Sequence, residues 1–527
     1  MISTLHPKSL EQSPLPKASE LRTLIDELIA DQAQLQTPVA RFAEIHDRQP
    51  DLADHYRNLI PLSQPAAGEQ YAFEVSLDRC TGCKACVSAC HNLNGLDEHE
   101  AWRDTGTLVG GKVAPGWQQT ITSACHHCED PGCLNGCPVG AYEKDPDNGI
   151  VRHLDDQCIG CSYCILKCPF DVPKYSKQRG IVRKCDMCHQ RLAEGEAPAC
   201  VQACPTEAIR IVKVPTQTPI APPRTSPLPV FLTGAPDPSI TRPTTRYIGR
   251  DVPLSAHAAD RSTLTPQHAH WPLIFMLVLT QAGIGVLGSA AFQESPALMV
   301  TGAILFNLGM AAATLHLGQP LKAWRFFLGL RTSWLSREIL AFSLFAPLPF
   351  ALAALPFLPD FPFKNLITPC VSWITIPLGI GAIFTSVMIY HDTRRSLWRL
   401  PLTATRFYGT TLSFFFLALS LHFPWAKCLL VVTLCAKAGP EISMLLHRRP
   451  SDEWAPDLHS ARLYRGPLKN LILIRAATTL FTLLALFVSP WLALPLLLIS
   501  EIFERQLFFQ AVQAPKMPGH FGSPLPH

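Results

Sequence analysis

The cysteines of this 527-residue chain are the side chains best placed to do chemistry, because 16 of the 19 lie between Cys80 and Cys204. They form four motifs, the first and third with the spacing C-x2-C-x2-C-x3-C and the other two close variants of it. Three cysteines two residues apart wrap one [4Fe-4S] cluster, and the fourth ligates the cluster of a paired motif. Sixteen thiolates at four per cluster predict four [4Fe-4S] clusters. The motifs are Cys80, Cys83, Cys86, Cys90; Cys125, Cys128, Cys133, Cys137; Cys158, Cys161, Cys164, Cys168; and Cys185, Cys188, Cys200, Cys204.

Zinc is the main alternative, because C-x2-C pairs alone would suit it. Zinc does not require a third cysteine two residues further on, nor that pattern twice, so the spacing favours clusters over zinc or disulfides. The residues alone leave the pairing open, since each fourth cysteine could serve a neighbouring motif or a distant one. His126, His127 and His189 stand beside ligands, and we expect them to be solvated or hydrogen-bonding neighbours.

Composition divides the chain into parts that must position these ligands. Residues 1–70 are expected to form a helical extension, with Leu21, Leu24, Ile25, Leu28 and Ile29 on one helical face. Residues 71–213 hold the cysteines, and residues 214–267, with eleven prolines, predict an extended, semi-rigid connector. Residues 268–510 form a membrane anchor, and residues 511–527 a tail. The formal charge of +4 is near neutral and gives no reason to expect a nucleic-acid partner.

Eight apolar segments follow His270, most of them long enough to cross a hydrocarbon layer of about 30 Å as a helix. We therefore predict an α+β, tandem ferredoxin-like four-cluster domain followed by an all-α bundle of eight transmembrane helices. The fifth segment is the shortest, so seven spans are the structural alternative. The segments are residues 271–288, 297–317, 339–358, 367–389, 407–422, 428–446, 471–488 and 491–509.

The stretch "CHHCEDPGCLNGCPVGA", with "CIGCSYCILKCPFDVPKY" and "PACVQACP", resembles the four-cluster iron–sulfur subunit of the DMSO reductase family of molybdenum enzymes over residues 71–250. The stretches "TLHLGQPLKAWRFFLGLRTSWLSREI" and "SEIFERQLFF" resemble that family's eight-helix anchor subunit over residues 268–510. The chain is thus identified as a fusion of the two subunits.

The resemblance implies that the first motif pairs with the fourth and the second with the third. Some relatives lack one cysteine of the second motif and hold a three-iron cluster there. All four are present here, so we expect a full cubane. The implied ligand sets are Cys80, Cys83, Cys86 with Cys204; Cys185, Cys188, Cys200 with Cys90; Cys125, Cys128, Cys133 with Cys168; and Cys158, Cys161, Cys164 with Cys137.

The resemblance implies an electron-transfer and membrane-anchor subunit that relays electrons between a membrane quinone, menaquinone or ubiquinone, and a separate molybdopterin-containing catalytic subunit. The chain would be part of an oxidoreductase complex similar to DMSO reductases or sulfite dehydrogenases, with no active site of its own beyond a quinone site. One alternative is a redox-driven ion-translocating module of the polysulfide reductase type. Another is a purely structural anchor. The substrate is set by the missing subunit.

Charged residues within apolar spans are costly and usually functional. We expect a quinone site at the membrane edge nearest the clusters, with His316 as proton acceptor and Glu338, Glu501 and Arg505 beside it. Lys437 and Glu441 lie four residues apart and are expected to form an intrahelical ion pair, with a proton or ion relay as the alternative. Cys370, Cys428 and Cys435 are expected to be small packing residues.

Basic residues predict the orientation in the membrane. Thirteen lie on the side of the cysteine-rich domain and only Lys364 and Lys427 on the other, which places that domain on the cytoplasmic side of a bacterial inner membrane by the positive-inside rule. The absence of a signal peptide agrees with this orientation. The alternative is that these side chains dock the domain. They are Lys322, Arg325, Arg331, Arg337, Arg394, Arg395, Arg399, Arg406, Arg448, Arg449, Arg462, Arg465 and Lys469.

Overall fold

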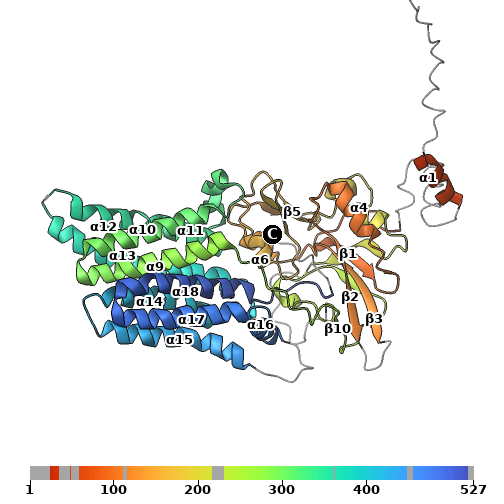
Figure 1. Ribbon diagram of the computed structural model, residues 1–527. Helices are drawn as coiled ribbons and strands as arrows, with labels where there is room; N and C mark the ends of the chain where they lie inside the picture. The colour runs from red at the N-terminus through yellow and green to blue at the C-terminus, as the bar shows by residue number, and fades with distance from the viewer. Residues whose placement is uncertain are drawn as a thin grey trace, which may run out of the picture.

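The computed structural model describes residues 24–34, 48, 58–110, 116–216, 231–359, 362–447 and 455–519. A cysteine-rich domain of short strands and helices abuts one end of a bundle of long helices (Figure 1). Helix α1 (Leu24–Gln34) lies apart from both, with Ile25, Leu28 and Ile29 exposed. It is part of the predicted N-terminal extension, most of which lies outside the described residues.

The outer half of the cysteine-rich domain joins the first and last cysteine motifs. Strand β1 (Glu69–Ser76) pairs with β8 (Ile209–Pro215) in antiparallel register, and helix α4 (Ala85–Asn94) packs on α8 (Ala199–Gln202). Tyr71, Phe73 and Val75 of β1 are buried beneath this layer. Segments more than 100 residues apart in the sequence therefore form one ferredoxin-like unit.

The inner half joins the second and third motifs in the same way. Helix α5 (Gly132–Gly136) packs on α6 (Tyr163–Lys167). Two short hairpins flank them, β4 (Tyr142–Lys144) with β5 (Val151–His153) and β6 (Lys174–Ser176) with β7 (Ile181–Arg183). The short helix α7 (His189–Ala193) follows the first two cysteines of the fourth motif.

Residues 231–267 differ from the predicted connector, because they form part of the cysteine-rich domain. After η1 (Pro238–Ile240), strand β9 (Arg246–Ile248) pairs with β1, and β10 (His257–Ala258) pairs with β2 (Asp104–Gly110), which also pairs with β3 (Trp117–Ser123). Residues 511–519 also pack here, with Met517 in the core and the Gly519 carbonyl accepting from Thr107 N at 3.2 Å. A proline-rich composition predicts little regular structure, and it cannot show that short segments will pair with the edges of existing sheets.

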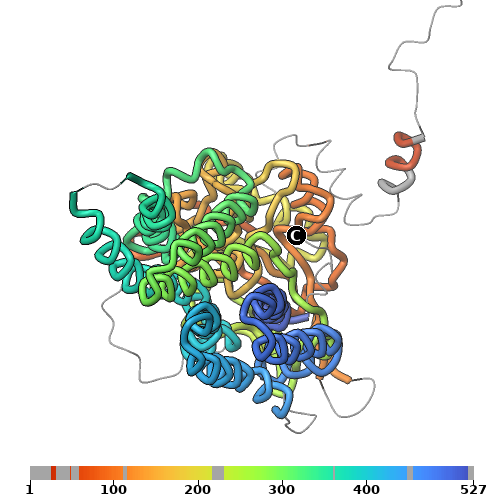
Figure 2. Tube along the Cα trace, turned by 60° about the vertical axis from the view of Figure 1, so that its left-hand side comes forward, coloured from red at the N-terminus to blue at the C-terminus, as the bar shows by residue number. Residues whose placement is uncertain are grey.

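The helical bundle is built around helix α9 (Trp271–Gln293), most of whose residues are buried. Its small residues allow close packing, since a Cβ on Gly283 would lie 2.6 Å from the Phe306 nitrogen of the next helix. The other long helices are α10 (Pro296–Thr314), α11 (Trp334–Phe345), α12 (Pro347–Ala354), α13 (Lys364–His391), α14 (Leu400–Leu419), α15 (Ala426–Leu446), α17 (Lys469–Val488) and α18 (Pro490–Gln510). Figure 2 shows the green helices and the blue helices as two neighbouring groups.

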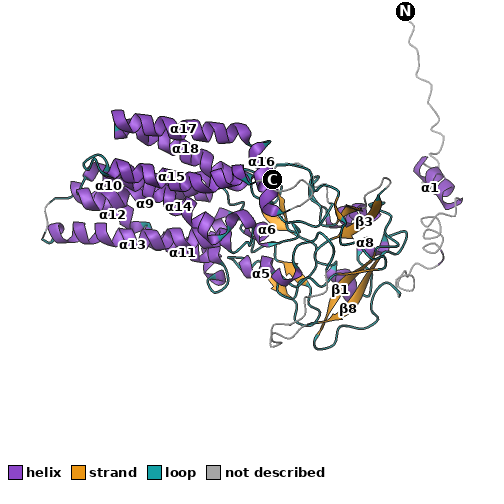
Figure 3. Cartoon of the chain, turned by 90° about the horizontal axis from the view of Figure 1, so that it is seen from below, coloured by secondary structure: helices purple, strands orange, loops and turns teal. Residues whose placement is uncertain are grey.

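Among the described residues, six helices are long and apolar enough to cross a membrane: α9, α10, the run from α11 through η3 (Leu355–Phe357), α13, α15 and α17. The protein is therefore a multi-pass membrane protein. Helices α14 and α18 have 20 and 21 residues and run alongside the six (Figure 3). Helix α18 carries Glu501, Glu504 and Arg505, so its composition is less apolar.

Short elements connect the bundle to the cysteine-rich domain at one end. They are η2 (Pro320–Gly329), η4 (Ser396–Trp398) and α16 (Pro456–Arg465). Trp398 is buried, and its Nε1 donates to the Phe508 carbonyl at 3.0 Å. In the membrane domain Cys370, Cys428 and Cys435 are exposed on the outside of the bundle, so they are not the buried packing residues that we expected.

Candidate functional site

The fold gathers the sixteen clustered cysteines into four groups, each of which draws three residues from one motif and one from another. Cys80, Cys83, Cys86 and Cys204 (quartet A) line one hollow. Cys125, Cys128, Cys133 and Cys168 (quartet C) line a second. All of these cysteines are free thiols. The grouping is the one that the resemblance implies, rather than one between motifs adjacent in the sequence.

The remaining cysteines form two further groups, identified by the electrostatic interactions between their sulfurs. Cys90 interacts with Cys188 and Cys200, and Cys185 with Cys90 and Cys200; these four are quartet B. Cys137 interacts with Cys158, Cys161 and Cys164, and these four are quartet D. Within the described ranges, no three His, Cys, Asp or Glu side chains are close enough to hold a single metal ion.

The quartets follow one another in the order D, C, B, A from the membrane domain outward. Cys125 of quartet C interacts with Cys185 of quartet B, and Cys86 of quartet A with Cys200 of quartet B. The buried Tyr142 interacts with Cys133 of quartet C and Cys164 of quartet D. Cys83, in quartet A, is exposed. The arrangement is a row that begins at the membrane and ends at the surface.

Backbone conformation directs the sulfurs inward and supplies them with hydrogen bonds. Gly82 and Gly160, inside the repeated C-x2-C loops, have φ of 73° and 68°, and the glycine allows this left-handed backbone. The amide of Ala141 donates to the Cys137 sulfur at 3.2 Å, and the amide of Ala208 to the Cys204 sulfur at 3.2 Å. Amide donors of this kind stabilise thiolate ligands and tune cluster potentials.

Two buried cations lie between the quartets. Arg103 interacts with Cys86 of quartet A and with Cys90, Cys185 and Cys200 of quartet B. Its Nε and Nη2 atoms are buried and have no hydrogen-bond partner among the described residues. Lys184, also buried, interacts with Cys125 and Cys133 of quartet C and with Cys185. Unmatched buried positive charge beside thiols fits anionic thiolate-ligated clusters.

Burial opposes the effect of these cations on the thiols, because it favours the protonated form. It raises the pKa of the Cys86 thiol to about 11 and that of Cys90 to about 12, although Arg103 lowers both. Without a metal these thiols would be protonated at neutral pH, whereas ligation to iron removes the proton. Backbone loops, cysteine donors and buried cations all fit [4Fe-4S] clusters.

Threonines from residues 231–267 contact the second motif, which the cysteine spacing does not predict. The Cys128 sulfur lies 3.4 Å from Thr241 Oγ1, and Thr244 Oγ1 donates to the His126 carbonyl at 2.8 Å. His126 Nδ1 is 2.8 Å from Thr245 Oγ1, and His127 Nδ1 accepts from the Val151 amide. Both histidines are buried and hydrogen-bonded, not solvated. The stretch "TRPTT", residues 241–245, contains all three threonines and was the sequence feature that could have indicated these contacts.

Quartet D is docked on the membrane domain by the segment between α10 and α11. Ser333 Oγ donates to the Gly136 carbonyl at 2.7 Å, and the Gly329 amide donates to the Pro138 carbonyl at 3.0 Å. Both acceptors flank Cys137. The Gln319 amide donates to the Ile159 carbonyl, next to Cys158, at 3.0 Å. The membrane domain thus holds both sides of quartet D.

A tyrosine inside the third motif completes this contact. Tyr163, between Cys161 and Cys164, is buried in the core of the helical bundle. Its hydroxyl lies 3.2 Å from the Ile389 carbonyl and 3.2 Å from Asp392 Oδ2 at the end of α13. Burial, together with Asp392 and Glu338, raises the pKa of the Tyr163 hydroxyl. Lys167 Nζ lies 2.7 Å from Asp392 Oδ2.

Two of the four predicted quinone-site residues lie near this contact. His316 follows α10, and its Nδ1 is buried without a hydrogen-bond partner in the described part of the chain. Glu338, in α11, is buried, accepts a hydrogen bond from Ser386 of α13 and interacts with Tyr163. Two acid–base groups therefore lie at the membrane edge next to quartet D.

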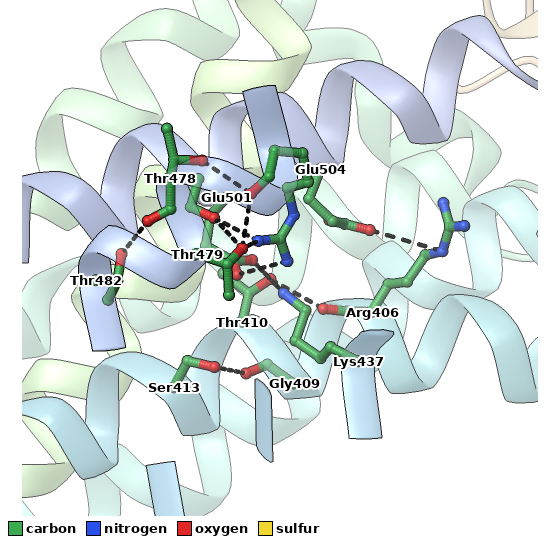
Figure 4. A network of polar contacts seen from close by, with 12 residues as sticks. Arg406, Gly409, Thr410, Ser413, Lys437, Thr478, Thr479, Thr482, Glu501 and Glu504 are labelled. Atoms are coloured by element: carbon green, nitrogen blue, oxygen red, sulfur yellow. Dashed lines mark hydrogen bonds and ion pairs between the residues drawn. The ribbon is translucent and has the colours of Figure 1, made fainter. Parts of the chain in front are cut away.

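Glu501 lies in another polar network of the bundle (Figure 4), to which Arg505 also belongs. Glu501 accepts from Lys437 and from Thr410 Oγ1, and Arg505 Nη2 donates to Gln281 Oε1 at 2.9 Å. No described hydrogen bond or ion pair joins Glu501 or Arg505 to His316 or Glu338, although Tyr390 interacts electrostatically with both Glu338 and Arg505. The predicted four-residue site is thus divided between two places.

The ion pair predicted within α15 is wrong. Lys437 pairs with Glu501 of α18, and Glu441 lies 3.7 Å from Arg475 of α17. Sequence reasoning missed Arg475, Glu504 and Arg406, although each is a charged residue within a helix of the bundle. Arg406 was predicted in a loop, but it lies buried inside α14, 3.6 Å from Glu504.

Three family models match the chain. Two describe 4Fe-4S dicluster domains, over residues 79–142 and 118–214, and one describes the DMSO reductase anchor subunit (DmsC), over residues 266–424. The B subunit of the anaerobic dimethyl sulfoxide reductase of Haemophilus influenzae is 40% identical over 170 residues, which cover 29% of this chain and 82% of that protein. The corresponding B subunit of Escherichia coli K12 is 40% identical over 148 residues, 27% of this chain and 72% of that protein. The hydrogenase-2 operon protein HybA of Escherichia coli O157:H7 is 35% identical over 156 residues, 25% of this chain and 48% of that protein.

Proposed function

This chain belongs to the family of the DMSO reductase iron–sulfur subunits and carries a DmsC-type anchor in the same polypeptide, and we propose that it relays electrons between membrane quinone and a separate molybdopterin-containing catalytic subunit. The observation that carries the proposal is the direct docking of quartet D on the membrane helices through Tyr163, Ser333 and Gly329. An electron carrier held there lies next to the lipid-soluble substrate. The row of quartets then leads away from the membrane.

Each quartet would hold one [4Fe-4S] cluster, which supplies one-electron redox chemistry. The protein's own contribution is to fix the cysteines and to adjust the charge around them. Added negative charge on the clusters is favoured by the amides that donate to Cys137 and Cys204 and by the cations Arg103 and Lys184. The exposed Cys83 marks the end of the row at which the catalytic subunit would dock.

The quinone site is proposed at His316 and Glu338, beside Tyr163. Oxidation of a quinol releases two electrons and two protons, so the site needs a proton acceptor next to an apolar slot. His316 Nδ1 is a buried nitrogen available for this role, and Glu338 is held by Ser386 on the neighbouring helix. Glu501 and Arg505 are left out, because they belong to the separate network.

We propose eight spans, because α14 and α18 are long enough and pack against α9 within the bundle. The basic loop residues favour a cytoplasmic position for the cysteine-rich domain at the inner membrane. Some of them also dock the domain, since Arg325 Nη1 donates to the Asp156 carbonyl at 3.3 Å. A periplasm-specific reporter fused after His527 should be inactive, and an active one would reverse the orientation.

The function is tested by quinol-driven reduction of the clusters in the anaerobically purified full chain. We expect His316→Ala to retain all clusters reducible by dithionite and to lose their reduction by a quinol analogue. His422→Ala is the matched control, since His422 follows α14 at the opposite end of the bundle, next to Gln293. Reduction of the His316→Ala variant at the wild-type rate would place the site elsewhere. Mass spectrometry of the intact complex should identify a molybdopterin protein.

A further inference from the structure

A second polar system, separate from the quinone site, occupies the interior of the membrane domain. Four cations and three carboxylates from α14, α15, α17 and α18 lie close together. Figure 4 shows four of them, Arg406, Lys437, Glu501 and Glu504. Charged groups inside a membrane span are costly, and they are usually functional. The seven residues are Arg406, Lys437, Arg475, Arg505, Glu441, Glu501 and Glu504.

The centre of this system is the pair formed by Lys437 and Glu501, near the middle of α15 and α18. Lys437 Nζ also donates to Thr410 Oγ1 at 2.8 Å, and Arg475 lies 3.7 Å from Glu501. Lys437 and Glu501 are 2% and 0% exposed. Gly409 provides the space for the lysine stem, since a Cβ there would lie 2.5 Å from Lys437 Cγ. The bundle is thus shaped around a deeply buried ionisable pair.

From this pair the polar groups continue toward the cysteine-rich domain. Arg505 lies 3.6 Å from Glu504, and Glu504 lies 3.6 Å from Arg406. Arg406 Nη2 donates to the hydroxyl of Tyr464 at 3.1 Å. Tyr464 belongs to α16, the short helix at that end of the bundle. Arg406 is about 9 Å along α14 from its first residue, at 1.5 Å per residue, so this arm connects the centre with the membrane edge.

In the other direction a line of hydroxyl groups follows α17. Arg475 Nη1 donates to Thr479 and to Ser500, and these two hydroxyls lie 2.9 Å apart. Thr482 Oγ1 donates to the Thr478 carbonyl. Beyond Thr482 the side chains are apolar, and four of them are buried: Ala485, Leu486, Ala493 and Leu497. An apolar layer at one end prevents a passive leak, as a coupled pathway requires.

Several polar atoms along this track are buried and have no hydrogen-bond partner among the described side chains and backbone groups, although five of them lie in the ion pairs at 3.6–3.7 Å. They are Glu501 Oε1, both Glu504 carboxylate oxygens, Arg406 Nε and Nη1, Arg505 Nε and Nη1, Arg475 Nε and Gln281 Nε2. Buried polar groups are ordinarily satisfied, and water supplies the bonds that side chains do not. Four of these atoms, Arg406 Nη1, Arg505 Nε and Nη1 and Gln281 Nε2, are in no described ion pair either, and they can donate to bound water along the track between Tyr464 and Glu501.

Charge balance identifies the mobile proton. With every group ionised, the seven residues carry four positive and three negative charges. Arginine does not lose its proton in proteins, so Lys437 is the one cation that can restore neutrality. The groups that face it are Glu501, Thr410, Arg475, Arg505, Glu504 and Glu441. Lys437 and Glu501 together can hold or release one proton.

We propose that this network is a proton-translocation pathway, with Lys437 and Glu501 as its proton-loading pair. A proton enters from the side of the cysteine-rich domain past Tyr464, Arg406 and Glu504, resides on the pair, and leaves past Thr479 and Thr482 through the apolar layer. Quinol oxidation to quinone releases two electrons and two protons at the separate site, and the electrons pass to the acceptor. The translocated proton is neither consumed nor produced, and the redox reaction supplies the driving force. The inference therefore rests on the proposed function only for its energy source.

The test uses the complete complex in vesicles with the cysteine-rich domain outward. A short-chain quinol is the donor, membrane-impermeant ferricyanide the acceptor, and a pH dye trapped in the lumen reports protons, with valinomycin and potassium ions to dissipate the potential. Wild-type complex should acidify the lumen during turnover, and an uncoupler should abolish the signal. Turnover without any lumenal change would overturn the translocation pathway, whereas absence of turnover would count against the proposed function.

Lys437→Met tests the loading pair, because it leaves three cations and three carboxylates and Arg475 still contacts Glu501. We expect at least a tenfold smaller lumenal acidification, with quinol oxidation within twofold of wild type. Gly409→Ala is the second variant, since the added methyl displaces Lys437 without changing any charge, and it should also reduce the signal. Lys427→Met, at the start of α15, is the matched control. Full acidification in both Lys437→Met and Gly409→Ala would overturn the proposal.

Discussion

The two halves of this molecule bury positive charge in different ways. In the cysteine-rich domain Arg103 and Lys184 face mainly thiols, although Lys184 also interacts with Asp186, and two guanidinium nitrogens of Arg103 have no hydrogen-bond partner among the described residues. In the membrane domain Lys437 and Arg475 face carboxylates of the same chain. The countercharge is a cofactor in the first case and a side chain in the second.

This difference determines the effect of removing one partner, either a cysteine ligand in the first domain or a carboxylate in the second. Loss of a cluster ligand changes the cofactor content, while the scaffold of strands and helices remains. Loss of a carboxylate in the membrane leaves a buried cation uncompensated, and the free energy of unfolding falls. The predictions below use this contrast, beginning with the largest effect.

Cys164→Ser should remove one cluster, because Cys164 lies in quartet D and serine is a poor ligand for iron in these clusters. Iron should fall from about 16 to about 12 per chain, and quinol should no longer reduce the remaining clusters, since quartet D is next to the membrane. Iron analysis and low-temperature EPR measure this. Cys435→Ser, on the exposed outside of α15, is the control and should keep all iron. Unchanged iron in Cys164→Ser, or abundant zinc, would contradict the cluster assignment.

Glu501→Gln should destabilise the membrane domain, because both Lys437 and Arg475 lose their shared carboxylate. Breaking a buried ion pair in this way costs about 3–5 kcal/mol. Thermal loss of the helical circular dichroism signal in detergent measures the effect. Asp457→Asn removes the exposed pair with Arg399 and should cost at most about 1 kcal/mol. Equal melting temperatures for the two variants would show that the buried network contributes no stability.

The sequence was sufficient to single out the sixteen cysteines that the fold gathers into quartets, because the spacing of cluster ligands is local and visible in single motifs. The family followed from the same residues and is confirmed by the relatives. The positions of Arg103 and Lys184 were not predictable. Their role depends on the packing of α4 against α8 and of α5 against α6, which brings separate motifs together.

In the membrane half the apolar segments predicted multi-pass helices, and in the described part of the chain six helices are long and apolar enough to cross a membrane. The partners of Lys437 and Glu441 were mispredicted, because spacing along one helix carries no information about neighbouring helices. For the same reason, the sequence did not show that His316 and Glu338 lie in one place and Glu501 and Arg505 in another. Helical periodicity shows which residues share a face, but it does not show which helix that face contacts.

Arg103→Met should lower the reduction potential of the clusters in quartets A and B, because a buried positive charge that stabilises the added electron is lost. We expect a shift of about 60 mV or more, a tenfold change for a one-electron couple. EPR-monitored redox titration measures it. Arg79→Met removes an exposed cation paired with Glu207 near quartet A, and solvent screening should hold its shift well below that of Arg103→Met. An unchanged potential in Arg103→Met would show that the charge is neutralised by another group.

The smallest effect is expected where the two halves meet. Tyr163→Phe keeps the ring in the core of the bundle but removes the hydroxyl that contacts Ile389 and Asp392. The loss is about 1 kcal/mol, the net value of a typical hydrogen bond, and Asp392 keeps its contact with Lys167. The variant should therefore retain all iron and nearly its full melting temperature. Protease accessibility of the segment between α10 and α11 should increase slightly, and quinol-driven reduction should slow because the domain interface is looser.

Asp392→Asn, which weakens the contacts of both Tyr163 and Lys167, should have the larger effect on the same two measurements. If Tyr163→Phe instead abolishes reduction by quinol while dithionite still reduces every cluster, the hydroxyl itself participates at the quinone site and is more than a docking contact.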